Sequence, residues 1–267
     1  MALVINLDRE TRRMAFQRAQ LAALGIGHER LPACTPDWLT PPETDPWWDR
    51  WERPMTAVEK AVLLSHRAAW ARVAAEGGPM LVLEDDAYLS MRTPDCLLDL
   101  NDLRSVDHVT LEARGRRKLL TRGAWDGRPG LRRLYQDRTG AAAYVLWPSG
   151  ARALLARSDR APAIADGVIC AAYEMVSLQV DPPLALQLDT CAHYGIAQPM
   201  HTVSAISPEG ARSPHRKSAG QRLRRAWTQA QMGLRRLSHP LAVRQDLAPQ
   251  GPWPEIALTR DPGPSGG

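Results

Sequence analysis

The sequence predicts an α/β fold built on a mostly parallel sheet. Short apolar runs that suit strands alternate along the chain with segments whose apolar residues recur at helical spacing. One run, residues 80–83, is apolar at every position, as expected of a central strand that helices cover on both faces. With 267 residues the chain can hold one substantial domain and an appendage, or two small domains.

The chain opens with a βα unit and a long loop. Residues 3–7 form an apolar run rich in strand formers, and apolar residues between 14 and 24 recur at helical spacing before Gly25 ends the helix. Residues 32–54 form a loop rich in proline that contains four tryptophans. A loop of this length is usually a lid, a binding loop or disordered, and the tryptophans argue against disorder. They could stack on a sugar ring, but we expect them to pack on the core.

The next helix leads to an acidic strand end. Thr56 and Glu59 form a capping box, which predicts a helix from there to about residue 76. The apolar strand 80–83 follows and ends in three consecutive acids, Glu84, Asp85 and Asp86. Ligands of open α/β sheets gather at the carboxyl ends of the strands, so the acids lie where a ligand is expected.

Further strands and helices complete the predicted domain. The strands cover residues 107–111, 141–147 and 184–188, and the helices cover residues 149–156 and 166–178. Beyond Pro208 the composition changes. We therefore place a single globular domain at residues 1–208 and a tail at residues 209–267, in which a basic helix precedes a flexible end rich in proline and glycine.

Composition argues against several classes of protein. No apolar run approaches the roughly 18 residues of a membrane-spanning helix, and the N-terminus lacks the pattern of a signal peptide. We therefore expect a soluble, intracellular protein. The four cysteines are scattered and form no CxxC pair, which argues against a zinc module and against a disulfide framework.

The positive charge is concentrated in the tail. Residues 211–244 contain nine Lys or Arg and no acid, and subtracting these nine from the net +5 leaves −4 for the rest. Within the tail, residues 219–237 predict a helix with arginines around one apolar stripe, formed by Leu223, Trp227, Ala230, Leu234 and Leu237. Such a helix is typical of a contact with an anionic membrane surface. Packing of the stripe on the domain is the alternative, whereas nucleic-acid binding has no supporting motif.

The acidic strand end has two interpretations. Three adjacent carboxylates repel one another unless a cation or bound donors offset their charge, and Mg²⁺ or Mn²⁺ often binds such oxygens together with substrate phosphates. The other interpretation is a solvated acidic turn. Asn6, Arg9 and Arg13 follow the first strand at the same sheet edge, where Asn6 could bind a nucleobase and the arginines a phosphate. Arginines at such positions are also often simply solvated.

Several blocks of the sequence resemble bacterial lipopolysaccharide-type glycosyltransferases of glycosyltransferase family 25, which are related to collagen galactosyltransferases. The opening VINLDRETRRMAFQRAQLAALGI is similar to the family's first block. MTAVEKAVLLSHRAAWARVAAEGGPMLVLEDDAYLS is similar to the central block, with its Ser-His helix and LEDD strand end. DHVTLEAR, RTGAAAYVLWPSGARALL and APAIADGVI resemble later blocks, in family order, so the resemblance covers about residues 3–187.

The resemblance implies a GT-A fold, a Rossmann-like single catalytic domain that binds a nucleotide diphosphate sugar with Mn²⁺ (or Mg²⁺). It gives Glu84, Asp85 and Asp86 the role of the metal-binding motif, with Asp86 as the direct ligand. Glu84 and Asp85 would contact the metal, the donor's ribose or further donors around it. One departure concerns residues 59–64, which replace glycine and cysteine residues common before the family's Ser-His. This leaves the identity of the donor sugar open.

The resemblance also suggests roles for residues outside the acidic motif. Asp166, matched to the family's late aspartate, is the candidate catalytic base, although it could instead be an ordinary helix cap. Glu174, two helical turns later, is the reserve candidate. Glu112 could bind donor or acceptor hydroxyls, and His66 could line the donor pocket. His193 is a candidate additional metal ligand.

These observations together predict a metal-dependent, inverting glycosyltransferase. It would move a hexose, galactose or glucose, from a UDP-sugar to a glycan or a lipid-linked saccharide during synthesis of cell-envelope polysaccharide. We expect a cytoplasmic location, with peripheral contact to the inner face of the membrane, and no nucleic-acid partner. The alternatives are a catalytically silent nucleotide-sugar-binding relative and an adaptor that acts through its tail.

Overall fold

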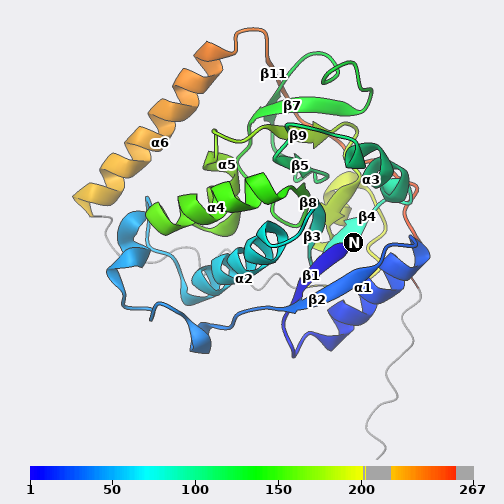
Figure 1. Ribbon diagram of the computed structural model, residues 1–267, viewed down its shortest axis with the longest axis horizontal. Coiled ribbons are helices and arrows are strands. Elements are labelled where there is room, and N and C mark those ends of the chain that lie inside the picture. The colour runs from blue at the N-terminus through cyan, green and yellow to red at the C-terminus, as the bar shows by residue number, and fades with distance from the viewer. Residues whose placement is uncertain (201, 203–217, 257–267) are drawn as a thin grey trace, which may run out of the picture.

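A nine-stranded sheet with helices on both faces forms the centre of the protein (Figure 1). The computed structural model describes residues 1–200, 202 and 218–256. The sheet has the order β11-β6-β7-β9-β5-β8-β3-β1-β2. Its strands are β1 (Ala2–Asn6), β2 (His28–Pro32), β3 (Met80–Glu84), β5 (His108–Thr110), β6 (Lys118–Leu120), β7 (Leu131–Gln136), β8 (Ala143–Leu146), β9 (Ser177–Val180) and β11 (Val243–Gln245). A second, two-stranded sheet pairs β4 (Ala87–Leu89) with β10 (Ala185–Gln187).

Most strands of the large sheet point the same way. β1 is parallel to both β2 and β3, and β5 is parallel to β9. The antiparallel strands β8, β7 and β11 run opposite to the other six. The predicted α/β class is therefore confirmed, and the carboxyl ends of β1, β3 and β5 share one edge of the sheet.

The helices form a layer on each face of the sheet. They are α1 (Thr11–Ala23), α2 (Ala57–Ala74), α3 (Thr93–Asn101), α4 (Pro148–Arg160), α5 (Ala165–Ala171) and α6 (Ala219–Ser238), and 3₁₀ turns occupy Pro36–Trp38, Pro46–Arg50 and Leu188–Tyr194. Helices α1 and α3 pack in the core on one face, and α2, α4 and α5 pack in the core on the other. None of the helices in the described part is long and apolar enough to cross a membrane.

The central strands bury side chains on both faces, as the apolar runs predict. In β3, Leu81 and Leu83 pack in the core beneath α1, whereas Val82 packs in the core beneath α2. This alternation follows from the two-residue period of a strand, which sends successive side chains to opposite faces. Helix α2 begins at the predicted capping box, because Thr56 and Glu59 each bond the other's backbone N–H.

The proline-rich loop packs on the domain through most of its tryptophans. Trp48 is buried, and Trp47 and Trp51 pack partly buried against the same core cluster. The indole N–H of Trp47 donates to the backbone oxygen of Asp159, 2.9 Å away, at the end of α4. Trp38 remains exposed. The expectation of packing is therefore confirmed for three of the four side chains.

The predicted helix over residues 166–178 is too long. Helix α5 ends at Ala171, and Ser177 begins β9, which lies between β5 and β7 and pairs with both. Leu178 and Val180 are buried on one face of this strand. Pairing on two sides satisfies the backbone of this segment in the sheet, which overrides its local helical pattern. The predicted strands near residues 107–111, 141–147 and 184–188 are present as β5, β8 and β10.

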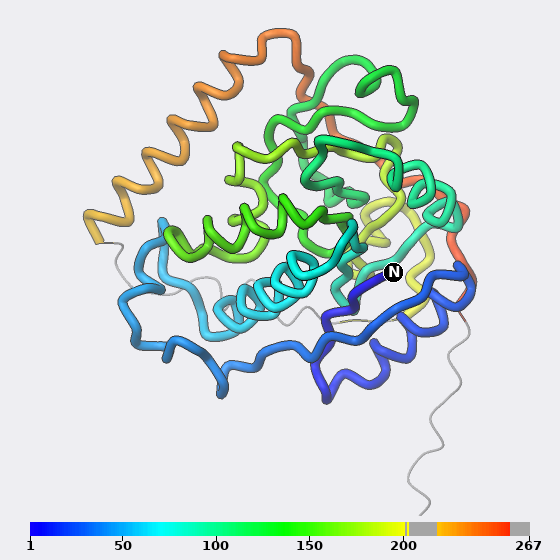
Figure 2. The backbone as a smooth tube through the Cα atoms, in the orientation of Figure 1, coloured from blue at the N-terminus to red at the C-terminus, as the bar shows by residue number. Residues whose placement is uncertain are grey.

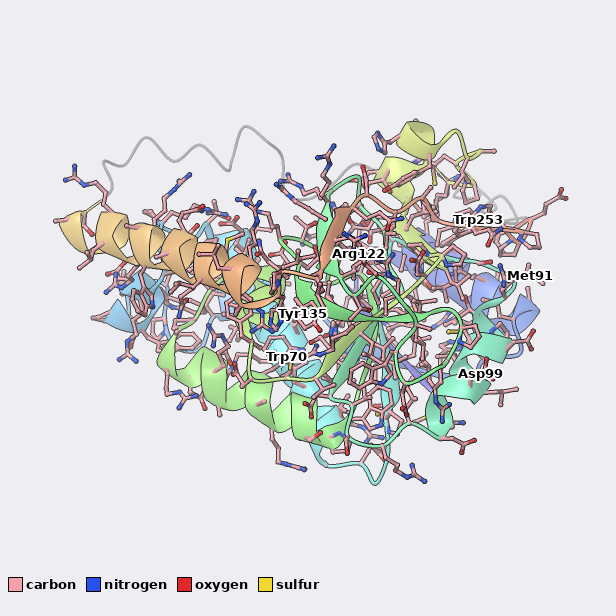
Figure 3. The ribbon with its side chains drawn as sticks, turned by 90° about the horizontal axis from the view of Figure 1, so that it is seen from above. Trp70, Met91, Asp99, Arg122, Tyr135 and Trp253 are labelled. Atoms are coloured by element: carbon pink, nitrogen blue, oxygen red, sulfur yellow. The ribbon has the colours of Figure 1, made fainter. Side chains whose placement is uncertain are left out.

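The described part of the tail returns to the domain. The predicted boundary at Pro208 lies outside the described residues and stays a prediction. Helix α6 is present, and β11 after it pairs with β6 and forms one edge of the large sheet. Figure 2 shows the chain crossing back over the molecule beyond α6. Trp253 then packs against Tyr88, and the backbone N–H of Met91 donates to Pro252, which places the two labelled side chains Met91 and Trp253 on the same side of the molecule in Figure 3.

Candidate functional site

The acidic motif lies in a tight turn at the carboxyl edge of the sheet. In the parallel pairing of β1 with β3, Ile5 is opposite Glu84, so Asn6 at the end of β1 comes beside Asp85. Asp85 and Asp86 form the turn between β3 and β4. The backbone oxygen of Asp86 accepts a bond from Leu188, which fixes the far side of the turn.

Asp85 is held by two of the predicted donor-binding residues. Asn6 Nδ2 lies 2.8 Å from one of its carboxylate oxygens, and a guanidinium nitrogen of Arg13 lies 3.1 Å from the other. Arg30 orients Asn6 in turn, because its Nε donates to Asn6 Oδ1. Burial raises the pKa of Asp85 despite these bonds. Asn6 and Arg13 therefore lie at the site, and both of them fix Asp85.

Glu84 is held at the end of a buried chain of hydrogen bonds. Trp70 has only a donor, so the Tyr144 hydroxyl accepts its N–H at 2.8 Å, and the same hydroxyl lies 3.0 Å from His66 Nδ1. His66 Nε2 lies 3.1 Å from Glu84 Oε1, and an ionised carboxylate only accepts, so Nε2 is the donor of this bond when Glu84 is charged. The other oxygen of Glu84 accepts from Gln187 at 2.9 Å. Burial, the largest single effect, disfavours the charged form, but the bond and charge of His66, the charge of Arg114 and the bond from Gln187 together lower the pKa of Glu84.

His66 therefore acts on the site through Glu84. It is completely buried within α2, and both of its ring nitrogens already have partners. Its position supports orientation of the carboxylate and not the direct lining of a donor pocket that the sequence suggests. Trp70, labelled in Figure 3, lies in the core at the other end of this chain.

Asp86 is the acid of the motif with an open oxygen. Its Oδ1 is buried and has no hydrogen-bond partner among the described residues. Burial, followed by the charges of Glu84 and Asp85, raises the pKa of Asp86 well above its usual value. Such a carboxylate is unfavourable when ionised, and a bound cation would offset both effects.

The acidic turn fits a hard cation, but the predicted three-residue set is not assembled. A buried carboxylate oxygen without a partner is the kind of ligand that Mn²⁺ and Mg²⁺ prefer. Within the described ranges, however, no group of three or more His, Cys, Asp or Glu is arranged to hold a metal. His193 is exposed and lies against Gly115, so it does not join Glu84 and Asp86 in a three-residue centre. The fit is to one or two carboxylates that share a cation with substrate phosphates.

Two further carboxyl groups occupy the same edge. Glu112 follows β5, is 1% exposed, and accepts the backbone N–H of Ala142 at 3.0 Å through Oε2. Its Oε1 has no partner in the described part of the chain. Burial raises the pKa of Glu112 to about 7. Asp166 lies in the first turn of α5, and burial and the charge of Glu84 raise its pKa to about 6.

A buried ion pair that the sequence analysis missed supports Glu112. Lys118 Nζ lies 2.7 Å from Asp137, 2.6 Å from Gln179 Oε1 and 2.9 Å from the backbone oxygen of Glu112. All four of these residues are buried, so the ammonium group fixes the segment after β5. In sequence, Lys118 belongs to a run of basic residues that reads as a solvated turn. Only its pairing in β6 shows that it faces inward.

Arg114 is a second residue that the sequence analysis missed. It follows Glu112 by two positions, and its charge lowers the pKa values of Glu84, Glu112 and Asp166. Its own ion pair, with Asp189, is loose at 3.8 Å. A guanidinium near three carboxyl groups is suited to bind a phosphate. The DHVTLEAR block contains it, so the resemblance is the signal that could have identified it.

Two predicted site residues lie elsewhere. Arg9 points into solvent and has a contact of 3.9 Å with Glu10. Glu174 is exposed and pairs with Arg157 at 3.5 Å, because α5 ends before it and the expected helical face does not form. The structure therefore removes the reason for naming Glu174 a reserve base.

Two clefts open on the described part of the domain. One contains Asp137, Gly140, Cys170 and Tyr173 and has about 390 Å³ of empty space, open solvent included. Gly140 links it to the site, because a Cβ there would lie 3.4 Å from Glu112 Oε2. The larger cleft, between α3 and residues 127–131, includes no residue that the sequence predicts for the site.

The fold and the acidic edge define an α/β protein with a candidate ligand site at the carboxyl ends of its strands. A family model described as "Glycosyltransferase family 25 (LPS biosynthesis protein)" matches residues 1–169. This chain belongs to glycosyltransferase family 25, and the predicted resemblance and enzyme class are confirmed.

Matches to individual proteins are remote. No curated protein matches the chain. Among solved structures, UDP-glucose pyrophosphorylase complexed with UDP-glucose is similar at 10% sequence identity and a TM-score of 0.37, covering 67% of this chain and 89% of that one. At this level the similarity does not bear on the ligand.

Proposed function

We propose that this glycosyltransferase moves a hexose, galactose or glucose, from a UDP-sugar to a glycan or lipid-linked saccharide with Mn²⁺ or Mg²⁺ and inversion at the sugar. The observation that carries the proposal is the buried, unpartnered Oδ1 of Asp86 at the carboxyl end of the central strand. The reaction would serve cell-envelope polysaccharide synthesis at the cytoplasmic face of a membrane.

The acidic turn would hold the metal and the diphosphate. Asp86 would be the direct ligand, with Glu84 beside it fixed by His66. The metal, when bound, would neutralise the leaving diphosphate. Arg114 would contact a phosphate oxygen, and Asp85 would hold the turn through its bonds with Asn6 and Arg13.

Glu112 and Asp166 would act on the sugars. Glu112 would bind a hydroxyl through its open Oε1. Asp166 would remove the proton of the acceptor hydroxyl as the displaced diphosphate leaves, and a pKa of about 6 suits a base that works near neutral pH. Burial first, and then the neighbouring charge of Glu84, raises the pKa of Asp166 into this range.

The test measures release of UDP from a panel of UDP-sugars, with and without Mn²⁺, for the wild type and Asp86→Asn. The substitution keeps the shape of the side chain and removes its charge. We expect metal-stimulated release to fall by about 10²-fold or more, because the transition-state charge is no longer neutralised. Asp102→Asn, at an exposed position directly after α3, is the matched control. Unchanged release in Asp86→Asn would refute the assignment, and binding of UDP-sugar without turnover in the wild type would favour a silent relative.

A further inference from the structure

Helix α6 points its apolar side chains into solvent. The exposed fractions are 73% for Leu223, 62% for Trp227, 61% for Leu234 and 77% for Leu237. Together with the exposed Ala230, these residues recur at spacings of four, three, four and three and form one stripe, and Leu241, just beyond the helix, is 80% exposed. Figure 1 shows α6 lying along one side of the body. We call this surface the α6 stripe.

The face of α6 that meets the domain is polar. Gln221 is buried, and Arg224 donates to the backbone oxygen of Asp49 at 3.0 Å. Arg235 donates to the backbone oxygen of Tyr135 and lies 4.4 Å from the ring of Tyr173. An ordinary surface helix buries its apolar side and exposes its polar side. This helix does the reverse, so packing of the stripe on the domain, the alternative that the sequence left open, is wrong.

The helix is also strongly cationic. Its twenty residues include five arginines and no acid. Arg222, Arg225 and Arg236 are exposed on the flank of the helix between the stripe and the side that meets the domain. A surface that combines exposed Leu and Trp with unopposed positive charge is complementary to the boundary layer of an anionic bilayer, where headgroups attract the arginines and acyl chains take the apolar side chains.

We propose that α6 docks in the plane of an anionic lipid bilayer through the α6 stripe. The polar contacts of Arg224 and Arg235 with the domain are compatible with this state, because they use the opposite face of the helix. A nucleic acid would use the arginines but would leave the stripe in water. The bilayer is therefore the partner that uses both features.

The place where α6 is anchored links docking to the reaction. Arg235, near the C-terminal end of α6, and Tyr135 of β7, labelled in Figure 3, line the same cleft as Asp137 and Gly140. Gly140 borders Glu112. Docking would therefore bring this cleft close to the headgroups, where the sugar of a lipid-linked acceptor lies. This consequence for the acceptor rests on the proposed function, whereas docking itself does not.

The test is flotation of the full-length protein with vesicles of phosphatidylglycerol and phosphatidylcholine, compared with phosphatidylcholine alone. We expect binding to the anionic vesicles that weakens with salt. The double variant Trp227→Gln, Leu234→Gln should lower the partition coefficient at least about tenfold, since each side chain loses its burial in lipid. Trp38→Gln, Leu98→Gln removes an equally exposed Trp and Leu outside α6 and should bind like the wild type. Arg222→Gln, Arg236→Gln should weaken binding and reduce its salt dependence.

Several outcomes would overturn the proposal. One is absence of binding to anionic vesicles. Another is an equal loss of vesicle binding in Trp227→Gln, Leu234→Gln and in the control Trp38→Gln, Leu98→Gln. Light scattering that shows a wild-type dimer and a Trp227→Gln, Leu234→Gln monomer would assign the stripe to a second copy. Binding to a DNA duplex that needs the arginines but not Trp227 would assign the helix to nucleic acid. Release of UDP with a soluble acceptor should be the same in Trp227→Gln, Leu234→Gln as in the wild type. If the wild type binds vesicles but releases no UDP, the proposed function is refuted and the docking proposal stands.

Discussion

The protein should become less stable as the pH rises, because Glu112 loses the proton that it binds in the native state. Burial raises the pKa of this carboxyl from the usual 4.5 to about 7. Between these two values the native state binds a proton that the unfolded state has released, so the free energy of unfolding falls with increasing pH. The contribution is fully present below pH 4.5 and is lost above about pH 7. A shift of this size corresponds to about 3 kcal/mol.

Glu112→Gln should remove this dependence. The amide has nearly the same shape, its oxygen can accept the N–H of Ala142 as Oε2 does now, and it has no proton to lose. The free energy of unfolding of the variant, measured relative to that of the wild type, should therefore increase by about 3 kcal/mol between acid and alkaline conditions. The groups that face Glu112 are Lys118 and Arg114, which lower its pKa, and Glu84, which raises it. The difference between variant and wild type isolates Glu112, because the other groups are present in both.

The assay is urea unfolding followed by tryptophan fluorescence at a series of pH values, without metal or UDP-sugar. Glu174→Gln is the matched control, because this exposed glutamate is paired only at the surface with Arg157. Its stability should follow the wild type at every pH, within the small worth of a surface ion pair. If wild type and Glu112→Gln lose the same free energy as the pH rises, the reasoning that burial raises the pKa of Glu112 is refuted.

Three other predictions concern single substitutions. Tyr144→Phe should lower the free energy of unfolding by about 2–4 kcal/mol in urea titrations, because it leaves two buried groups, one of them His66 Nδ1, without a partner. Gly150→Ala should cost about 1–3 kcal/mol, since its Cβ would lie 2.3 Å from a backbone oxygen. Gly233→Ala, with nothing within 4 Å, should stabilise α6 by about 1 kcal/mol, and equal effects at the two glycines would contradict the packing. Asp166→Asn should lower kcat by about 10²–10⁴-fold and abolish the loss of activity below about pH 6, and a retained acid limb would assign the base elsewhere.

Local patterns were sufficient where a single element determined the structure. The capping box at Thr56 and the fully apolar strand 80–83 each depend on neighbours in sequence, and both are present as predicted. The segment that contains β9 was misread, because its strand character comes from pairing with β5 and β7 on either side. Lys118 was missed for the same reason. Its three acceptors come from segments up to about 60 residues away in sequence, so no local pattern predicts them.

The edge of the sheet could be predicted as a site, but the division of roles within it could not. The resemblance and the apolar strand before it identify Glu84, Asp85 and Asp86 as a group. Which acid is free to bind a ligand depends on which acids are already bound, and that information lies in distant elements.

Distant partners occupy the first two acids of the turn. His66 from α2 and Gln187 from β10 bond both oxygens of Glu84, and Asn6 and Arg13 bond both oxygens of Asp85. Asp86 has one buried oxygen without a partner among the described residues, and burial, followed by the charges of Glu84 and Asp85, raises its pKa. Unpaired burial of a carboxylate is costly, so a fold that keeps it must recover the free energy in another state. Under the proposed function, binding of a cation with a diphosphate would satisfy the oxygen and the charge together, which is why Asp86→Asn is the decisive substitution.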